Sequence, residues 1–151
     1  EGLFDQTDVE MLGMIAGSTF LSLSAGPFVG LACQAVVIGW DRLTKGISLE
    51  RDIHGYTVID SMKAIMALGS MDYLKIYGWS SERALVFTGV KFGRSPMIAI
   101  RAHPLKPALV VYQRPEHVDD LAIRLATLEN LPLARTGLQV STLVERLERL
   151  E

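Results

Sequence analysis

The sequence predicts one domain of the α/β (or α+β) class, with a mixed sheet, a central β-hairpin and a C-terminal β-α-β-α unit. Three observations support this prediction. The chain has 151 residues, which is the size of one ordinary domain and enough for one sizeable core. Its apolar fraction of 49% and charged fraction of 21% are typical of a globular protein. In the last third of the chain, strand-length apolar segments alternate with helix-length amphipathic segments.

The C-terminal unit has the clearest pattern. We expect a strand at residues 107–112, a helix at 116–129, a strand at 131–135 and a helix at 140–150. Strand, helix, strand and helix in this order predict two parallel strands joined by a right-handed crossover.

The central part of the chain predicts three short strands, at residues 73–79, 84–90 and 97–101. Between the last two, residues 91–96 are few and include Gly93 and Pro96, which favour a tight turn. We therefore expect a β-hairpin here, with cations at its tip.

The first half has weaker patterns. Apolar spacing predicts helices at residues 5–16 and 57–68, ended by Gly17 and Gly69, and alternation predicts a strand at 19–23. Gly26-Pro27 predicts a turn. Residues 28–40 fit either a buried strand or a buried helix, with a strand favoured at 36–38 by three β-branched residues. The charged segment 41–55 predicts an exposed, mobile connection.

Residues 11–40 carry no charge, and this run is longer than the roughly 20 residues that span a bilayer. Its serines, its glycines and Gly26-Pro27 disfavour a membrane helix. The acidic residues that precede it disfavour a secretory signal peptide. We expect this segment to lie in the core of a soluble protein, with no membrane contact.

Charge and cysteine content restrict the function further. The net charge is −2 and the pI about 5.9, so no overall field attracts nucleic acid, and we expect nucleic acid not to be the partner. Cys33 is the only cysteine, which excludes an internal disulfide and predicts a buried structural thiol in a cytoplasmic protein. The chain begins at Glu1 and not at Met, so we expect that it can be a piece of a longer polypeptide.

One stretch stands out as a candidate site. No acidic residue lies between Glu82 and Glu116, although the net charge of the protein is negative. The stretch contains Arg83, Lys91, Arg94, Arg101, His103, Lys106 and Arg114. Guanidinium and ammonium groups bind phosphate and carboxylate, so we expect Lys91, Arg94, Arg101, His103 and Lys106 to form an anion site. The alternative is an ordinary solvated surface.

A second candidate lies in the charged segment that follows Trp40. It comprises Asp41, Arg42, Asp52 and His54, in which an Asp and a His could act as an acid/base pair, or which could be a surface loop. No spacing typical of metal ligands and no G-x-G-x-x-G run occurs, so we expect no metal and no cofactor. Tyr73, Tyr77 and Trp79 alternate, which fits core packing better than base stacking.

The run Leu131-Pro132-Leu133-Ala134-Arg135-Thr136, followed by Ser141, Thr142, Leu143 and Leu147, resembles the end of regulatory α/β domains of the DRTGG and HPr-kinase N-terminal type. The resemblance covers about the last 45 residues and implies a regulatory or ligand-sensing role. The Asp-Arg-Thr-Gly-Gly run itself is absent, because this chain reads Ala134-Arg135-Thr136-Gly137-Leu138. No GxxxxGK[ST] loop occurs, so kinase activity is not implied.

Three functions remain open at this point. The first is a regulatory domain that binds a small anionic metabolite and self-associates as a homodimer. The second is a small enzyme that acts on a phosphorylated or carboxylated substrate through His54 or His103. The third is a nucleic-acid-associated protein that uses the basic hairpin.

Overall fold

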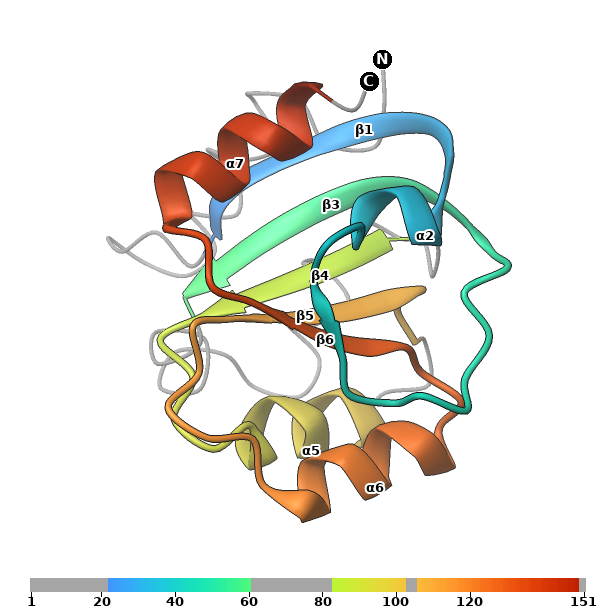
Figure 1. Ribbon diagram of the computed structural model, residues 1–151, viewed down its shortest axis with the longest axis vertical. Coiled ribbons are helices and arrows are strands. Elements are labelled where there is room, and N and C mark those ends of the chain that lie inside the picture. The colour runs from blue at the N-terminus through green and yellow to red at the C-terminus, as the bar shows by residue number, and fades with distance from the viewer. Residues whose placement is uncertain (1–21, 61–82, 103–105, 150–151) are drawn as a thin grey trace.

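The computed structural model describes residues 22–60, 83–102 and 106–149. In these ranges the chain forms an α/β fold around a six-stranded mixed sheet with strand order β1-β3-β4-β5-β6-β2 (Figure 1). The strands are β1 (Ser22–Ala32), β2 (Asp41–Arg42), β3 (Asp52–Asp60), β4 (Arg83–Thr88), β5 (Leu109–Gln113) and β6 (Leu133–Thr136). The helices are α2 (Cys33–Val36), α5 (Arg94–Ala102), α6 (Asp120–Leu128) and α7 (Val140–Arg149). The predicted fold class and mixed sheet are confirmed.

The centre of the sheet is parallel. Strands β3, β4, β5 and β6 run in the same direction, and the antiparallel strands β1 and β2 flank them. Every residue of β4 and β5 is buried, as is usual for parallel strands that are covered on both faces. Their side chains are therefore apolar in continuous runs and do not alternate with polar ones.

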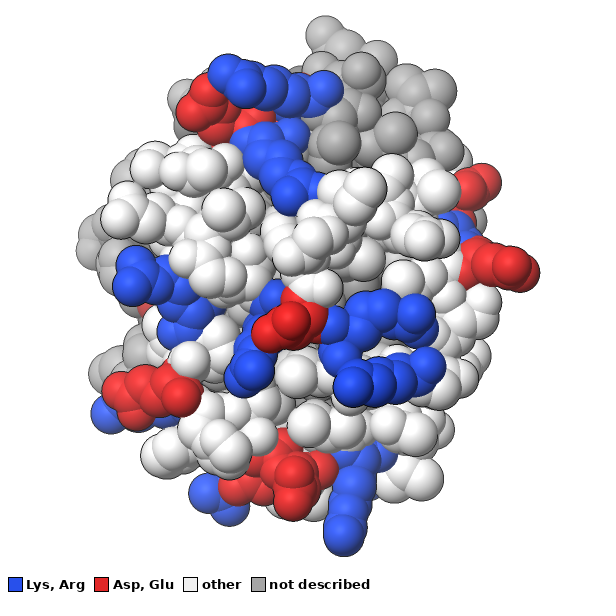
Figure 2. Space-filling view, viewed as in Figure 1, with Lys and Arg blue, Asp and Glu red and all other residues white. Residues whose placement is uncertain are grey.

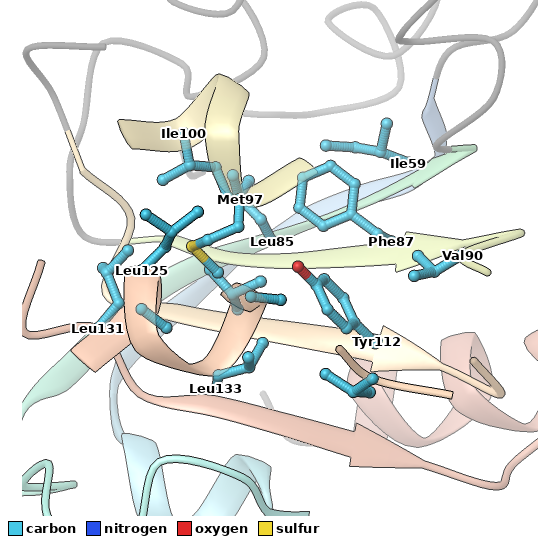
Figure 3. Packing of buried hydrophobic residues seen from close by; sticks show 14 residues of the cluster. Ile59, Leu85, Phe87, Val90, Met97, Ile100, Tyr112, Leu125, Leu131 and Leu133 are labelled. Atoms are coloured by element: carbon cyan, nitrogen blue, oxygen red, sulfur yellow. The ribbon is translucent and has the colours of Figure 1, made fainter. Parts of the chain in front are cut away.

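Helices cover both faces of this sheet. Met97 and Ile100 of α5, together with Leu125 of α6, pack on the face that carries Phe87 and Tyr112 (Figure 3). On the opposite face, α2 and α7 contribute a second cluster, whose buried members include Cys33, Val36, Val58, Val86, Val111, Leu143 and Leu147. The described part of the chain thus has three layers, helix, sheet and helix (Figure 1).

The order of elements after β4 explains this layering. Strands β4, β5 and β6 are neighbours in sequence order, so right-handed crossovers place α5 and α6 on the same face. Helix α7 follows β6 and packs on the other face. The predicted C-terminal β-α-β-α unit and the parallel pairing of its two strands are confirmed, within a few residues at each boundary.

The predicted central hairpin is wrong. Residues 97–101 belong to helix α5, and β4 pairs with β5 in parallel instead. The physical reason is a helical period: Met97 and Ile100 are buried, whereas Ile98 and Arg101 between and after them are exposed. Pro96 fits the first turn of a helix, where its missing N–H removes no hydrogen bond.

Several predictions for the first half are also wrong. Gly26-Pro27 lies within β1, a strand at the edge of the sheet, where proline is tolerated, and the pairing register shifts between Pro27 and Leu31. Residues 57–60 belong to β3 and not to a helix, because Thr57, Val58 and Ile59 join the ladder with β4. Residues 36–38 are not a strand, since α2 ends at Val36. The segment 41–55 contains β2 and the start of β3.

The remaining predictions of this region fall partly or wholly outside the described residues. The helices and strands predicted at 5–16, 61–68 and 73–79 lie there, as does most of the strand at 19–23. Of the uncharged run 11–40, the described part forms β1, α2 and the turn at residues 37–40. None of the helices in the described ranges has the length and apolar character needed to cross a membrane.

A close contact between the β4–α5 loop and β5 fixes one side of the core. The Tyr112 hydroxyl donates a hydrogen bond to the Gly93 carbonyl oxygen, at 2.6 Å. Gly93 has a positive φ of 82°, and a β-carbon added to it would lie 2.4 Å from Cε2 of Tyr112. The ring cannot retreat easily, because it packs edge to face with Phe87 at a centroid distance of 6.3 Å.

We therefore expect Gly93→Ala to lower the free energy of unfolding by about 2–4 kcal/mol, because backbone strain and a steric clash add together. The matched control is Gly89→Ala. Gly89 also has a positive φ, but a β-carbon added to it would meet no atom within 4 Å. This substitution should therefore lower the free energy of unfolding only by the backbone strain, about 1–2 kcal/mol. Urea denaturation measures both, and equal losses would contradict the packing argument.

The single cysteine gives a second test. Burial raises the pKa of the Cys33 thiol to about 11, and the nearby charges of Arg51 and Arg42 lower it by a smaller amount. At pH 8 roughly one thiol in a thousand is then ionised, and only the thiolate reacts. We expect native Cys33 to react with Ellman's reagent at least a hundredfold more slowly than in urea at pH 8, and faster as the pH rises towards 11. Equal rates in the two states would show that the thiol is accessible.

Candidate functional site, a cleft at the ends of strands β5 and β6

A cleft of about 660 Å³ lies beyond the carboxyl ends of β5 and β6. Arg114 and Pro115, which follow β5, form one side, and Thr136 to Leu138 at the end of β6 form another. Residues 38–41, between α2 and β2, together with Arg135 and Arg146, complete its lining.

The topology explains why the cleft lies here. The chain leaves β5 towards α6 on one face of the sheet, and it leaves β6 towards α7 on the opposite face. Two neighbouring parallel strands whose connections diverge leave a crevice at their carboxyl ends. Open α/β sheets bind their ligands at such switch points.

Arg114 is the most available cation of the cleft. Its backbone N–H donates to the Thr136 carbonyl oxygen at 2.8 Å, which ties the end of β5 to that of β6. Its φ of +48° is unusual for a residue other than glycine. The side chain is exposed and makes no ion pair or hydrogen bond within the described ranges. Its guanidinium is therefore available for a ligand.

Arg135 and Arg146 are held by neighbours. Arg135 Nε lies 3.2 Å from Oδ2 of Asp41, its partner across the β6–β2 pair. Both side chains are exposed, so this ion pair contributes little stability. Arg146 donates through Nη2 to the Ile38 carbonyl oxygen at 2.9 Å, and its guanidinium carbon lies 5.0 Å from the centroid of the Trp40 ring.

Trp40 forms the apolar part of the wall. Its indole N–H is buried and has no hydrogen-bond partner within the part of the chain that the structure describes. Hydrogen bonding thus does not fix the ring, which is held by packing and by the Arg146 guanidinium. Arg146 therefore connects helix α7 to the segment between α2 and β2.

Positive charge extends beyond the cleft. Arg42 in β2 and Lys45, three residues later, are both exposed, and Arg42 donates to the Ile47 carbonyl oxygen at 2.6 Å. Figure 2 shows Lys and Arg side chains gathered across the middle of the face on which β2 and β6 lie, around a small acidic group. This face combines a hollow with several separated cations.

The cations predicted as an anion site are distributed along α5. Arg94 Nε lies 3.5 Å from Asp119, which caps the N-terminus of α6. Arg101 Nε lies 3.2 Å from Glu129 at the other end of α6. Lys106 Nζ donates to the carbonyl oxygens of Ile100 and Arg101 at the C-terminal end of α5, at 3.0 and 2.7 Å.

The other members of the cationic stretch are separate from these. Arg83 is completely buried and donates to the Tyr56 carbonyl oxygen and the Thr57 hydroxyl, at 2.6 and 3.2 Å. Lys91 is exposed in the loop before α5, and His103 lies outside the described residues. A ligand role for Lys91, Arg94, Arg101, His103 and Lys106 stays a prediction, and the described geometry gives three of them partners within the fold.

The second predicted set is divided between two strands. Asp41 and Arg42 lie in β2, whereas Asp52 and His54 lie in β3. Three strands separate β2 from β3, so the two pairs are about 19 Å apart at the usual strand spacing. Asp41 lines the cleft instead. The sequence reasoning missed Trp40, Arg114, Arg135 and Arg146 as a group, because they come from four separate segments.

The fold and the cleft define the class, which is a three-layer α/β domain with a crevice at a topological switch point. Two archaeal proteins are similar in sequence. One, from Methanocaldococcus jannaschii, is 43% identical over 112 residues, which are 73% of this chain and 46% of that protein. The other, from Archaeoglobus fulgidus, is 46% identical over 102 residues, which are 66% of this chain and 44% of that protein. Each is named as an uncharacterized HTH-type transcriptional regulator.

The match thus spans a little under half the length of each relative. No protein-family model matches the chain, and no solved structure is significantly similar to it. The resemblance of the last 45 residues to regulatory domains of the DRTGG type therefore stays a prediction.

Two predictions from the sequence are corrected by these relatives. The function as a sensor of a small anionic metabolite is wrong, because both relatives are named as transcriptional regulators, which act on DNA. The expectation that nucleic acid is not a partner is wrong for the same reason. The alternative of a nucleic-acid-associated protein agrees better, although the hairpin on which it was based is a helix. Self-association stays a prediction.

The role of Arg146 in holding Trp40 and Ile38 in the wall of the cleft can be tested by substitution. We expect Arg146→Met to lower the free energy of unfolding by about 1–2 kcal/mol, because it removes the cation–π contact and the hydrogen bond to Ile38. The matched control is Arg149→Met, one turn later, where an exposed ion pair with Glu145 contributes at most about 0.5 kcal/mol. Urea denaturation followed by tryptophan fluorescence measures both. Equal effects would contradict the anchoring role.

Proposed function

We propose that this chain is the α/β domain of a transcriptional regulator that acts on DNA. The observation that carries the proposal is the 43% identity over 112 residues, 73% of the chain, to a protein named as a regulator. A second relative, from another archaeal genus, has the same name and a similar identity. Similarity over this length joins the chain to these proteins through the domain and not through a short motif.

The relatives' name implies a helix-turn-helix, in which two helices are joined by a short turn and the second enters the major groove. In the described part of this chain, α5, α6 and α7 are separated from one another by β5 and β6, which is a different arrangement. We therefore assign to the α/β domain a role beside the element that reads the bases. A cytoplasmic location, predicted from the single cysteine, agrees with this role, because the chromosomes of the two relatives' organisms lie in that compartment.

The proposal predicts occupancy of specific chromosomal sites. In cells of the source organism that carry an epitope tag on the native gene, chromatin immunoprecipitation should enrich a limited set of loci upstream of genes. Deletion of the gene should change the transcript levels of those genes. The control is an equally tagged cytoplasmic enzyme. Enrichment no greater than that of the control would contradict the function.

A further inference from the structure

The basic face around the cleft has a charge pattern that suits an extended polyanion. We propose that the α/β domain itself contacts the sugar–phosphate backbone of double-stranded DNA through this face, with Arg114 and Arg135 as the principal contacts. The inference rests on the proposed function and adds to it, because it assigns a DNA surface to the domain that lies beside the base-reading element.

The local charge at the cleft is positive. Among the described residues, the cleft is lined by Arg114, Arg135 and Arg146 and by one carboxylate, that of Asp41. The whole protein has a net charge of −2, so its overall field repels DNA. A concentration of cations on one face supplies the local attraction that binding to phosphates requires.

Two arginines of the cleft are available for a ligand. Arg114 has no partner within the described ranges, and Arg135 is paired with Asp41 only at an exposed site. Replacing such a weak pair by a contact with phosphate costs little, and a guanidinium can bind phosphate through two parallel hydrogen bonds. Arg94 and Arg101 of α5 are about as exposed as Arg135, but their carboxylate partners at the ends of α6, Asp119 and Glu129, are less exposed than Asp41. Their ion pairs are therefore less screened by solvent, and the cleft, where Arg114 has no partner within the described ranges, is the better candidate for a phosphate contact.

The spacing of the cations suits a row of phosphates. Arg114 directly follows β5, and Arg135 belongs to β6, the next strand of the sheet. Arg42 lies in β2, one strand further on, and its side chain points to the other side of the sheet from that of Arg135, because Asp41 is the residue opposite Arg135. At the usual strand spacing the three residues extend over about 10 Å, and Figure 2 shows the cations spread across the face and not converging on one point. A single small anion needs donors that converge on it. A DNA strand carries a row of phosphate charges, which suits cationic side chains that are spaced apart.

The backbone at Arg114 has a left-handed conformation, with a φ of +48°. A left-handed conformation costs an ordinary residue about 1 kcal/mol or more, and such conformations cluster at functional sites. Glycine or asparagine would meet the requirement of this turn with less strain. An arginine at this position places a guanidinium at the mouth of the cleft at some cost in stability.

The test is binding of the whole chain to a fluorescein-labelled duplex of mixed sequence, about 25 base pairs long, in about 50 mM salt and then at rising salt. Anisotropy should show binding whose affinity falls steeply as salt increases. Arg114→Asn should weaken binding roughly 5- to 20-fold and reduce the slope of log affinity against log salt by about one. Asparagine is chosen because it tolerates the left-handed backbone.

Two further variants control for charge and position. Arg114→Lys keeps the charge and should bind within about threefold of the wild type, because phosphate contacts are mainly electrostatic. Arg124→Asn removes an exposed arginine from α6, away from the cleft, and should bind within about twofold. Circular dichroism and urea denaturation establish that each variant is folded.

Several results would overturn the inference. The first is that the wild type does not bind the duplex at low salt. The second is that Arg114→Asn and Arg124→Asn lower the affinity for the duplex equally. The third is that calorimetry shows saturable binding of inorganic phosphate while the duplex does not bind. If these occur while chromatin immunoprecipitation still enriches discrete loci, the regulator function stands and the DNA face is wrong. If the duplex results are as expected but no loci are enriched, the face binds DNA and the regulator function is wrong.

Discussion

The structure depends on one constraint, which is that a parallel sheet must bury both of its faces. The strands β4 and β5 are buried at every position, so each needs a covering layer on either side. Right-handed crossovers place α5 and α6 on one face, and only a change of direction after β6 lets α7 cover the other. The cleft is the consequence of that change, because the chain leaves β5 and β6 towards opposite faces.

The same arrangement distributes the charges. Helix α6 brings Asp119 and Glu129 next to α5, where they pair with Arg94 and Arg101. No acidic residue lies near these arginines in the sequence. The crossover from β5 to β6 nevertheless brings two carboxylates next to them, from residues that lie about 25 positions further along the chain. Beyond the ends of β5 and β6, the cleft brings together Arg114, Arg135 and Arg146 with one carboxylate among the described lining residues, that of Asp41. A protein of slightly negative charge thereby gathers cations locally.

This contrast bears on how a domain of this kind can serve a regulator. Overall composition argues against DNA as a partner, whereas the two relatives point towards it. The two observations agree when only the charges near the bound DNA are counted, because salt screens electrostatic attraction beyond about 10 Å at moderate ionic strength. The cations within that distance of a bound strand matter more than the net charge.

The sequence alone determined the C-terminal unit, since the periods of residues 107–150 differ clearly between strand and helix and the order β-α-β-α permits one handedness. It also predicted the fold class and indicated a buried thiol at Cys33. The prediction from the sequence was wrong at residues 97–101, because so short a segment fits both the spacing of a strand and that of a helix. It was also wrong at residues 57–60, which form a strand because they pair with β4. Only the tertiary structure could assemble the cleft. Trp40, Arg114, Arg135 and Arg146 are far apart along the chain, and the order of strands in the sheet, which local patterns do not encode, brings them to one edge.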